Sequence, residues 1–212
     1  MGAVIEVDSV DVVAGDATLL APVSVSTRRG EALVVRGRNG SGKSTLLRVL
    51  AGSRAPSHGT VRIGGEAVTE RDRGFRRRVA AMIGLPPLAP DLTVRDHVTL
   101  VATTWWDDPR AATRRAEEVL AELGLSASGS RFPHELSSGQ MQLLALAMVL
   151  ARPFEVLILD EPEQRLDPGH VASVVRALRA RRDGGATLVV ATHSPVLAEA
   201  LADRTLQLDA AA

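Results

Sequence analysis

The chain has 212 residues, with 25 basic and 25 acidic side chains, so its formal net charge is zero. Hydrophobic residues make up 45% and charged residues 24%, proportions typical of a folded globular protein and unlike those of a nucleic-acid-coating chain. Because cysteine is absent, a disulfide scaffold, a cysteine-based zinc site and a thiol nucleophile are excluded. We expect one domain over residues 1–212, since this length supports one substantial core and is short for two.

Apolar segments are too short to predict a membrane-spanning helix. The longest unbroken apolar run, residues 143–151, has nine residues, whereas a spanning helix needs about 20. Residues 1–13 carry three acids and no basic start, so we expect no secretory signal. The sequence therefore predicts a cytoplasmic chain, and any work at a membrane would need spanning helices from another subunit.

The first part of the chain consists of short β-rich runs and one helix. The predicted elements are strands over 4–7, 18–26 and 32–36, a helix over 44–51, and strands over 61–63 and 79–83. Gly52 ends the helix.

A glycine-rich loop stands between the third predicted strand and the helix. Residues 37–45 read Gly-Arg-Asn-Gly-Ser-Gly-Lys-Ser-Thr and match the phosphate-binding pattern G-x-x-x-x-G-K-[ST]. Glycines in such a loop let successive N–H groups curl around a triphosphate, and the helix N-terminus adds partial positive charge. Lys43 would contact the β- and γ-phosphates, and the Ser44 hydroxyl would bind Mg²⁺. The predicted phosphate-binding residues are Gly37, Asn39, Gly40, Ser41, Gly42, Lys43, Ser44 and Thr45.

The choice of basic residues supports a special role for Lys43. Of the 25 basic residues 24 are arginine, and Lys43 is the only lysine. A general bias toward arginine explains the other sites. A position that keeps lysine despite this bias is a candidate for a task that needs a compact point charge, which the planar guanidinium of arginine does not provide.

The stretch of about residues 86–152 has a helical pattern. Helices are predicted over 94–104, 109–123 and about 140–151. The second has Pro109 in its first turn and Gly124 just past its end, the residues that helix starts and ends favour. We interpret this stretch as a helical insertion within the single domain.

Strands and helices alternate again after the insertion. A strand is predicted over 156–160, a helix over 168–182 and a strand over 187–191. Alternation of strands and helices predicts an α/β fold with a largely parallel sheet.

Two carboxylates end the strand that follows the insertion. An apolar strand delivers Asp160 and Glu161 to the carboxyl edge of the sheet, where ligands bind in open α/β folds. Asp160 would help to hold Mg²⁺ through water, and Glu161 would polarise the water that attacks the γ-phosphate. Two acids that only face solvent would show the same pattern, so this assignment depends on the phosphate-binding loop.

A further motif precedes the last helix of the insertion. Residues 136–140 read Leu-Ser-Ser-Gly-Gln, and with the loop and the carboxylate strand they resemble the L-S-G-G-Q signature of ATP-binding-cassette (ABC) ATPases. Leu166-Asp167 resembles the D-loop of that family, and His193 resembles its switch histidine. The order and spacing of these motifs match from about residue 4 to residue 208.

The resemblance implies a P-loop NTPase fold with a mostly parallel core sheet, an N-terminal antiparallel β part and a helical insertion. Such cassettes work as head-to-tail pairs that enclose two ATP molecules with Mg²⁺. The loop, the two carboxylates and the catalytic His193 of one subunit would face Ser137, Gly139 and Gln140 of the other. The physics agrees, because these signature residues lead into a helix N-terminus that can bind a γ-phosphate.

The resemblance also implies partners and a location. The chain would be the ATP-hydrolysing subunit that drives an integral membrane permease, at the cytoplasmic face of the membrane, and its small size resembles exporter-type cassettes. Its second partner would be another copy of itself or a related cassette, and no nucleic acid is expected. Two alternatives are a soluble cassette ATPase for assembly or regulation and an ATP-binding switch that does not hydrolyse.

The sequence departs from the family pattern at several positions. Ala14 stands where an aromatic residue usually stacks on adenine, and Gly84 stands where a glutamine usually touches Mg²⁺ and the permease. The helix after the signature is unusually apolar, which favours core packing over a protein contact. The only tryptophans, Trp105 and Trp106, fit core packing and a partner contact equally well.

Overall fold

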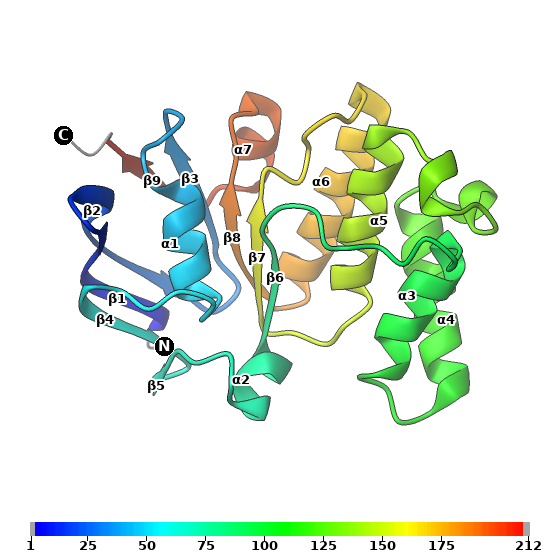
Figure 1. The fold of residues 1–212 in the computed structure, drawn as a ribbon, viewed down its shortest axis with the longest axis horizontal. Coiled ribbons are helices and arrows are strands. Elements are labelled where there is room, and N and C mark those ends of the chain that lie inside the picture. The colour runs from blue at the N-terminus through cyan, green and yellow to red at the C-terminus, as the bar shows by residue number, and fades with distance from the viewer. Residues whose placement is uncertain (1–2, 210–212) are drawn as a thin grey trace. The chain divides into compact units, whose positions relative to one another are not determined.

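The computed structural model describes residues 3–209, which form two compact units (Figure 1). The first, the sheet unit, comprises residues 3–83, Phe154–Glu161 and residues 179–209. The second, the helical unit, comprises Gly84–Pro153 and Pro162–Leu178. The helical insertion expected over about 86–152 thus falls inside the helical unit, which also takes in a later segment of the chain.

Two sheets make up the sheet unit. The antiparallel sheet has the order β2 (Ala17–Arg28), β1 (Ala3–Ala14), β4 (His58–Ile63) and β5 (Glu66–Ala67). The parallel sheet has the order β6 (Val79–Met82), β7 (Val156–Asp160), β8 (Thr187–Ala191), β3 (Ala32–Gly37) and β9 (Arg204–Leu208). The predicted fold class, a mostly parallel core sheet with an N-terminal antiparallel part, is confirmed.

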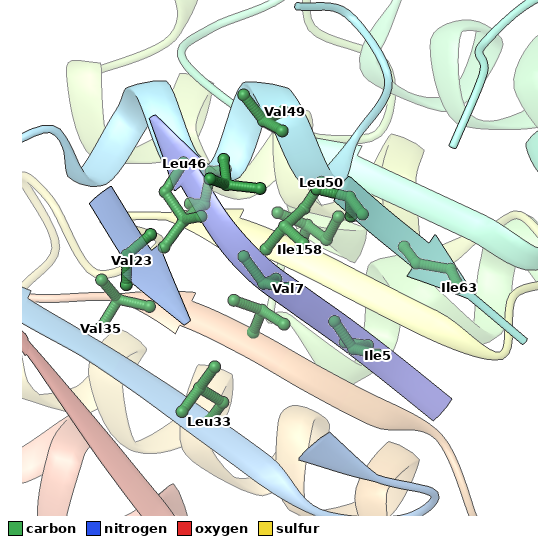
Figure 2. Packing of buried hydrophobic residues seen from close by; sticks show 14 of the residues in the cluster. Ile5, Val7, Val23, Leu33, Val35, Leu46, Val49, Leu50, Ile63 and Ile158 are labelled. Carbon is green, nitrogen blue, oxygen red and sulfur yellow. The ribbon is translucent and has the colours of Figure 1, made fainter. Parts of the chain in front are cut away.

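Helix α1 (Lys43–Leu50) carries the core of the sheet unit. Its apolar side chains, among them Leu46 and Leu50, are buried in one cluster with residues of both sheets (Figure 2). Ile5 and Val7 reach this cluster from β1 because residues two apart in a strand point to the same face. Burying such side chains contributes about 1.5–3 kcal/mol each, so this cluster holds α1, and the loop before it, against the sheets.

The central strands β7 and β8 of the parallel sheet are mostly apolar along their whole length. All five residues of β8 are buried, as are the first four of β7. Central parallel strands are covered on both faces, which is why they lack the apolar–polar alternation of β2. This strong signal explains why β7 and β8 have the bounds that the sequence predicts.

Four short elements of the sheet unit were not predicted. They are β5, α2 (Arg73–Arg78), α7 (Pro195–Leu201) and β9. Helix α2 buries only Phe75, and β9 buries only Leu208, so neither has the apolar periodicity that marks an element in a sequence. Strand β9 forms because it pairs with β3, a partner distant in sequence.

The helical unit contains the predicted helices. They are α3 (Val94–Thr103), α4 (Pro109–Glu122), α5 (Ser138–Leu150) and the part of α6 (Pro168–Asp183) up to Leu178, with two short 3-10 turns at Ser126–Ser128 and Pro133–Glu135. Within this unit α3 contacts α4 and α5. The starts of α3, α4 and α5 are capped by the side chains of Thr93, Asp108 and Ser137. Such caps satisfy free N–H groups, so the predicted bounds agree with the structure to within two residues.

The apolar helix α5 is a core element. It buries Leu143, Leu144 and most of the residues that follow up to Ala151, which supports the core-packing interpretation of its composition. Over residues 3–209, no helix combines the length and the apolar character needed to cross a bilayer.

Candidate nucleotide-binding site

The glycine-rich loop connects β3 to α1. Gly42 occupies the N-cap position of α1 in the left-handed region, with φ of 91°. A Cβ atom at Gly42 would lie 2.8 Å from the carbonyl oxygen of Leu19, and one at Gly37 would lie 2.3 Å from the Ser41 Oγ. Both positions therefore require glycine, since the loop is folded against itself and against β2.

Lys43 is the first residue of α1 and is buried, with 7% exposure. Its Nζ donates hydrogen bonds to the carbonyl oxygens of Gly37 at 2.8 Å and Arg38 at 3.2 Å. An ammonium group has three donors, so one N–H is left for an anion in the loop. The carbonyl groups of Gly37 and Arg38 thus hold the Lys43 ammonium group at the N-terminus of α1. The partial positive charge of a helix N-terminus favours an anion at the same place.

A pocket of about 350 Å³ lies in front of this loop, within the sheet unit. It is lined by Thr18, Leu19, Asn39, Gly40, Gly42, Lys43, Ser44, Thr45 and Glu161. Six predicted phosphate-binding residues and the predicted catalytic carboxylate therefore border one cavity, although about 120 residues separate them in the chain. Two further predicted residues, Gly37 and Ser41, lie close to each other in the loop, and the buried Ser41 Oγ has no hydrogen-bond partner among residues 3–209.

The two carboxylates at the end of β7 have different settings. Asp160 is half-buried and is the last residue of β7, where it pairs in register with Ala191 of β8. Glu161 follows with φ of 48°, a left-handed conformation that costs a non-glycine residue free energy. Its N–H donates to the carbonyl oxygen of Ala191 at 2.8 Å, which continues the ladder and holds this conformation. The Glu161 carboxylate is thereby turned into the pocket.

His193 lies next to Glu161 in the sheet unit. Its Nε2 is 3.3 Å from the Glu161 Oε1, and the two side chains are 47% and 28% exposed. His193 follows β8, the strand beside β7, so parallel neighbours bring the two residues together at the carboxyl edge of the sheet. An imidazole that donates from Nε2 to the Glu161 Oε1 helps to orient this carboxylate.

The signature residues belong to the helical unit, where they start α5. Ser137 Oγ accepts a hydrogen bond from the Gln140 N–H at 3.2 Å, and Gln140 Oε1 accepts one from the Ser137 N–H at 3.0 Å. This reciprocal capping box fixes the first turn of the helix. The Gln140 Nε2 also donates to Ser128 Oγ at 3.2 Å. The two polar side chains therefore build the helix start itself.

The segment before α6 passes so close to Gly139 that a larger side chain would not fit there. A Cβ atom at Gly139 would lie 2.7 Å from the carbonyl oxygen of Arg165, a residue with φ of 64°. Asp167, just beyond, accepts hydrogen bonds from the His170 N–H at 3.0 Å and from its Nδ1 at 2.6 Å. These hydrogen bonds from the His170 backbone and side chain lower the pKa of the Asp167 carboxyl.

The two positions that depart from the family pattern are both exposed. Ala14 ends β1 and pairs with Ala17 across a tight turn. The hairpin residues that do line the pocket are Thr18 and Leu19, which the sequence did not reveal because their proximity to the loop depends on how β2 packs on α1. Gly84 has φ of 79°, and a Cβ atom there would meet nothing within 4 Å.

The tryptophans are anchored inside the helical unit. The Trp106 Nε1 donates to the carbonyl oxygen of Ala151 at 3.0 Å, and the Arg152 guanidinium lies 4.4 Å from the centre of the Trp105 ring. Both rings thus fasten the turn after α3 to the end of α5. Packing explains Trp105 well, whereas Trp106 remains 37% exposed.

The comparisons with known proteins agree on one family. Residues 20–164 match the family described as ABC transporter. The lipoprotein-releasing system ATP-binding protein LolD of Aquifex aeolicus is 34% identical over 195 residues, covering 90% of this chain and 87% of that protein. The cytochrome c biogenesis ATP-binding export protein CcmA of Xanthomonas oryzae pv. oryzae is 36% identical, with coverage of 90% and 87%. A probable anion import ATP-binding protein of Haloferax volcanii is 34% identical, with coverage of 90% and 72%.

Solved structures show the same fold. The structure of an ATP-binding subunit of an ABC transporter matches with a TM-score of 0.86 and 27% identity, covering 99% of this chain and 88% of that one. The dimeric structure of a bacterial ABC transporter cassette matches with a TM-score of 0.87 and 26% identity, covering 97% and 94%.

Proposed function

The chain belongs to the ABC transporter family, and from that premise we propose that it is the nucleotide-binding subunit whose ATP hydrolysis drives a membrane transporter. The observation that carries this proposal is the pocket in which the loop around Lys43 and the carboxylate of Glu161 meet. Phosphate-binding donors and a candidate base that border one cavity are what hydrolysis of a phosphoanhydride requires.

In this proposal the triphosphate binds against the loop. The free N–H of Lys43 and the backbone N–H groups at the start of α1 would bind the phosphate oxygens. Glu161 would accept the proton of the attacking water, and His193 would hold the carboxylate in the required orientation. Thr18 and Leu19 would contact the remainder of the nucleotide, since they line the same pocket beside the loop.

The oxygen atoms of the Ser44 hydroxyl and the Asp160 carboxylate are suitable ligands for Mg²⁺. In the described part of the chain no three carboxylate or histidine side chains gather as a metal cage, which fits an ion that protein holds through one or two ligands and substrate phosphates. Ser44 and Asp160 would be those ligands, the first lining the pocket and the second being the last residue of β7, directly before Glu161. When bound, Mg²⁺ would offset negative charge on the phosphates.

The site is proposed to be completed by a second cassette. Ser137, Gly139 and Gln140 would face the nucleotide of the other subunit through the N-terminus of α5, where Ser137 and Ser138 are exposed. The dimeric cassette structure similar to this chain supports that arrangement. Either a second copy or a related cassette would serve as the partner.

The energy of hydrolysis is proposed to reach an integral membrane permease, which would place the chain at the cytoplasmic face of the membrane. The similar proteins named above are ATP-binding subunits of transport systems, which favours this over a soluble assembly ATPase. They include both import and export proteins, so the proposal covers a transporter of either direction. Co-purification of the chain with a hydrophobic membrane protein tests this partner.

Substitution of the candidate base tests the site directly. Glu161→Gln should retain ATP binding and lower hydrolysis by about 10²–10⁴-fold, because the proton acceptor is lost while the side-chain volume is kept. Glu199→Gln, the same change at an exposed position of α7, serves as the control and should leave hydrolysis unchanged. Hydrolysis by Glu161→Gln at the wild-type rate would contradict the assignment.

The shared site has its own test. The ATPase rate per molecule should rise with protein concentration, since a lone chain lacks the partner's helix start. Ser137→Arg should remove this rise while the circular dichroism spectrum stays that of the folded chain. A rate per molecule that is constant down to dilute monomer would contradict a shared site.

A further inference from the structure

A second groove lies in the sheet unit, away from the phosphate-binding loop. Its volume is about 370 Å³, and its wall comes from the end of α1, the loop that follows, β4 and the segment after β5. Most of its lining is apolar, including Val49, Pro56, Val61 and Val68, and Arg54 is its one charged residue. The groove thus combines small apolar side chains with a single half-buried guanidinium.

The groove borders the arginine-rich helix α2. A Cβ atom at Gly52, in the groove wall, would lie 2.8 Å from the Glu70 backbone nitrogen and 3.3 Å from the Phe75 ring. Phe75 is the one buried residue of α2 and fixes that helix beside the groove. The helix that carries Arg73, Arg76, Arg77 and Arg78 therefore lies next to the groove wall at Gly52.

This region is a positively charged part of the chain. Residues 48–78 contain eight arginines against Glu66, Glu70 and Asp72, a net charge of +5, whereas the whole chain has net charge zero. Arg78 pairs with Glu66, and Arg76 donates to the carbonyl oxygens of Glu70 and Arg71. Arg54, Arg71, Arg73 and Arg77 form no ion pair with any residue between 3 and 209, and the last three are exposed.

We propose that this groove and the arginines beside it bind an extended acidic segment of a partner protein. Small apolar side chains of the segment would fill the groove, and its carboxylates would pair with Arg54 and with the arginines of α2, whose guanidinium groups suit bidentate contacts. A lipid headgroup or a nucleic-acid backbone would use the positive charge alone. The apolar lining favours a peptide, in which alternate side chains project to opposite sides.

The proposal does not depend on ATP hydrolysis, and a binding experiment on the full chain tests it. The probe is a fluorescein-labelled octapeptide of alternating glutamate and valine, and the control is the lysine–valine peptide of equal length. Fluorescence anisotropy should show binding of the first that weakens as salt is raised, and no binding of the second. Equal binding of both peptides, or binding of neither, would overturn the proposal.

Charge-reversal variants locate the binding surface. Arg54→Glu and the double variant Arg71→Glu/Arg77→Glu should each weaken peptide binding at least about tenfold. The matched control, Arg110→Glu/Arg114→Glu on α4, makes the same charge change in the helical unit and should leave the affinity unchanged. Unchanged basal ATPase activity of the Arg71→Glu/Arg77→Glu variant establishes that it is folded. An equal loss in the control variant would overturn the proposal.

Two further probes address other anionic partners. Vesicles that contain phosphatidylserine and a 20-base-pair DNA duplex are each added to the complex with the labelled peptide. Failure of both to displace the peptide at equal charge concentration supports recognition by the groove. Displacement by either would mean that charge alone is recognised and would overturn the proposed peptide partner.

Discussion

The sheet unit and the helical unit use their polar residues in opposite ways. In the sheet unit the backbone does the structural work: Gly42 lets the loop approach Leu19, and the side chains of Lys43 and Glu161 are left to face the pocket. In the helical unit the side chains of Ser137 and Gln140 do the structural work, because each caps the other's N–H. The first unit therefore offers charged side chains to a ligand, while the second offers the start of a helix.

Because of this difference, we expect substitutions in the phosphate-binding pocket and substitutions in the signature at the start of α5 to reduce activity for different reasons. A substitution in the pocket of the sheet unit chiefly removes a ligand contact, although Lys43 also donates hydrogen bonds to the carbonyl oxygens of Gly37 and Arg38. A substitution at the start of α5 removes a bond that holds the helix, so a loss of activity there includes a loss of stability. The following experiments separate the two cases, beginning with the largest expected effect.

Lys43→Ala should weaken ATP binding without unfolding the chain. A hydrogen bond to a charged group contributes about 1.5–3 kcal/mol, which corresponds to a loss of roughly 10- to 150-fold in affinity. Nucleotide titration measures this, and thermal unfolding without nucleotide checks the fold. Arg48→Ala, an exposed residue in the last turn of the same helix, is the control and should bind ATP normally. ATP affinity unaltered by Lys43→Ala would contradict the role of the loop.

Gly139→Ala should destabilise the chain. The added methyl group would lie 2.7 Å from the carbonyl oxygen of Arg165, so either the segment before α6 or the start of α5 must shift. Overpacking of this kind costs about 1–3 kcal/mol, which chemical denaturation can measure. Ser138→Ala, one residue earlier in the same turn, is the control. If both variants unfold at the same denaturant concentration, the inference that the Arg165 carbonyl group requires glycine at position 139 is contradicted.

Ser137→Ala should lower the free energy of unfolding by about 1 kcal/mol, the usual contribution of a serine N-cap. It should also reduce ATPase activity, since the α5 helix start is proposed to face the nucleotide of the partner subunit. Ser138→Ala again serves as the control, because Ser138 is exposed and does not cap the helix. A Ser137→Ala variant as stable as Ser138→Ala would show that the capping box contributes nothing.

Acid should weaken helix starts in the helical unit. Hydrogen bonds from the Thr93 side chain and backbone lower the pKa of Asp96, and those from His170 lower the pKa of Asp167. A carboxyl whose folded pKa lies below its unfolded value of about 4 stabilises the fold above that value and loses the effect as pH falls through the lower one. The melting temperature of wild type should therefore exceed that of Asp96→Asn at pH 6. The difference should shrink as pH is lowered below about 4, and a constant difference would contradict the assignment.

Local patterns account for most of the elements that the sequence predicts. The apolar runs of β7 and β8 and the proline–glycine punctuation around α4 lie within contiguous residues, so their bounds are readable without a fold. Helix α2 and strand β9 escape prediction because each buries one residue. Their positions depend on partners elsewhere in the chain.

The nucleotide-binding site likewise has a part that contiguous residues predict and a part that depends on residues elsewhere in the chain. Its residue types and spacing predict a phosphate ligand, since the chemistry is carried by nine consecutive residues. By resemblance, Ala14 stands at the position of the family's adenine-stacking aromatic residue, whereas Thr18 and Leu19 of the same hairpin are the residues that line the pocket. The difference arises because the hairpin turn sets Ala14 at the tip of β1, while the packing of β2 on α1 decides which residues reach the loop.

The sequence by itself determined the family, the fold class and the chemical types of the candidate residues, because motif identity and periodicity are local properties of the chain. Tertiary structure alone decided that the Glu161 carboxylate borders the same pocket as Lys43 and lies 3.3 Å from the His193 imidazole. The physical reason is the strand order β6-β7-β8-β3-β9, which differs from the chain order. It brings residues more than a hundred positions apart to one edge of the sheet, and no local pattern records that distance.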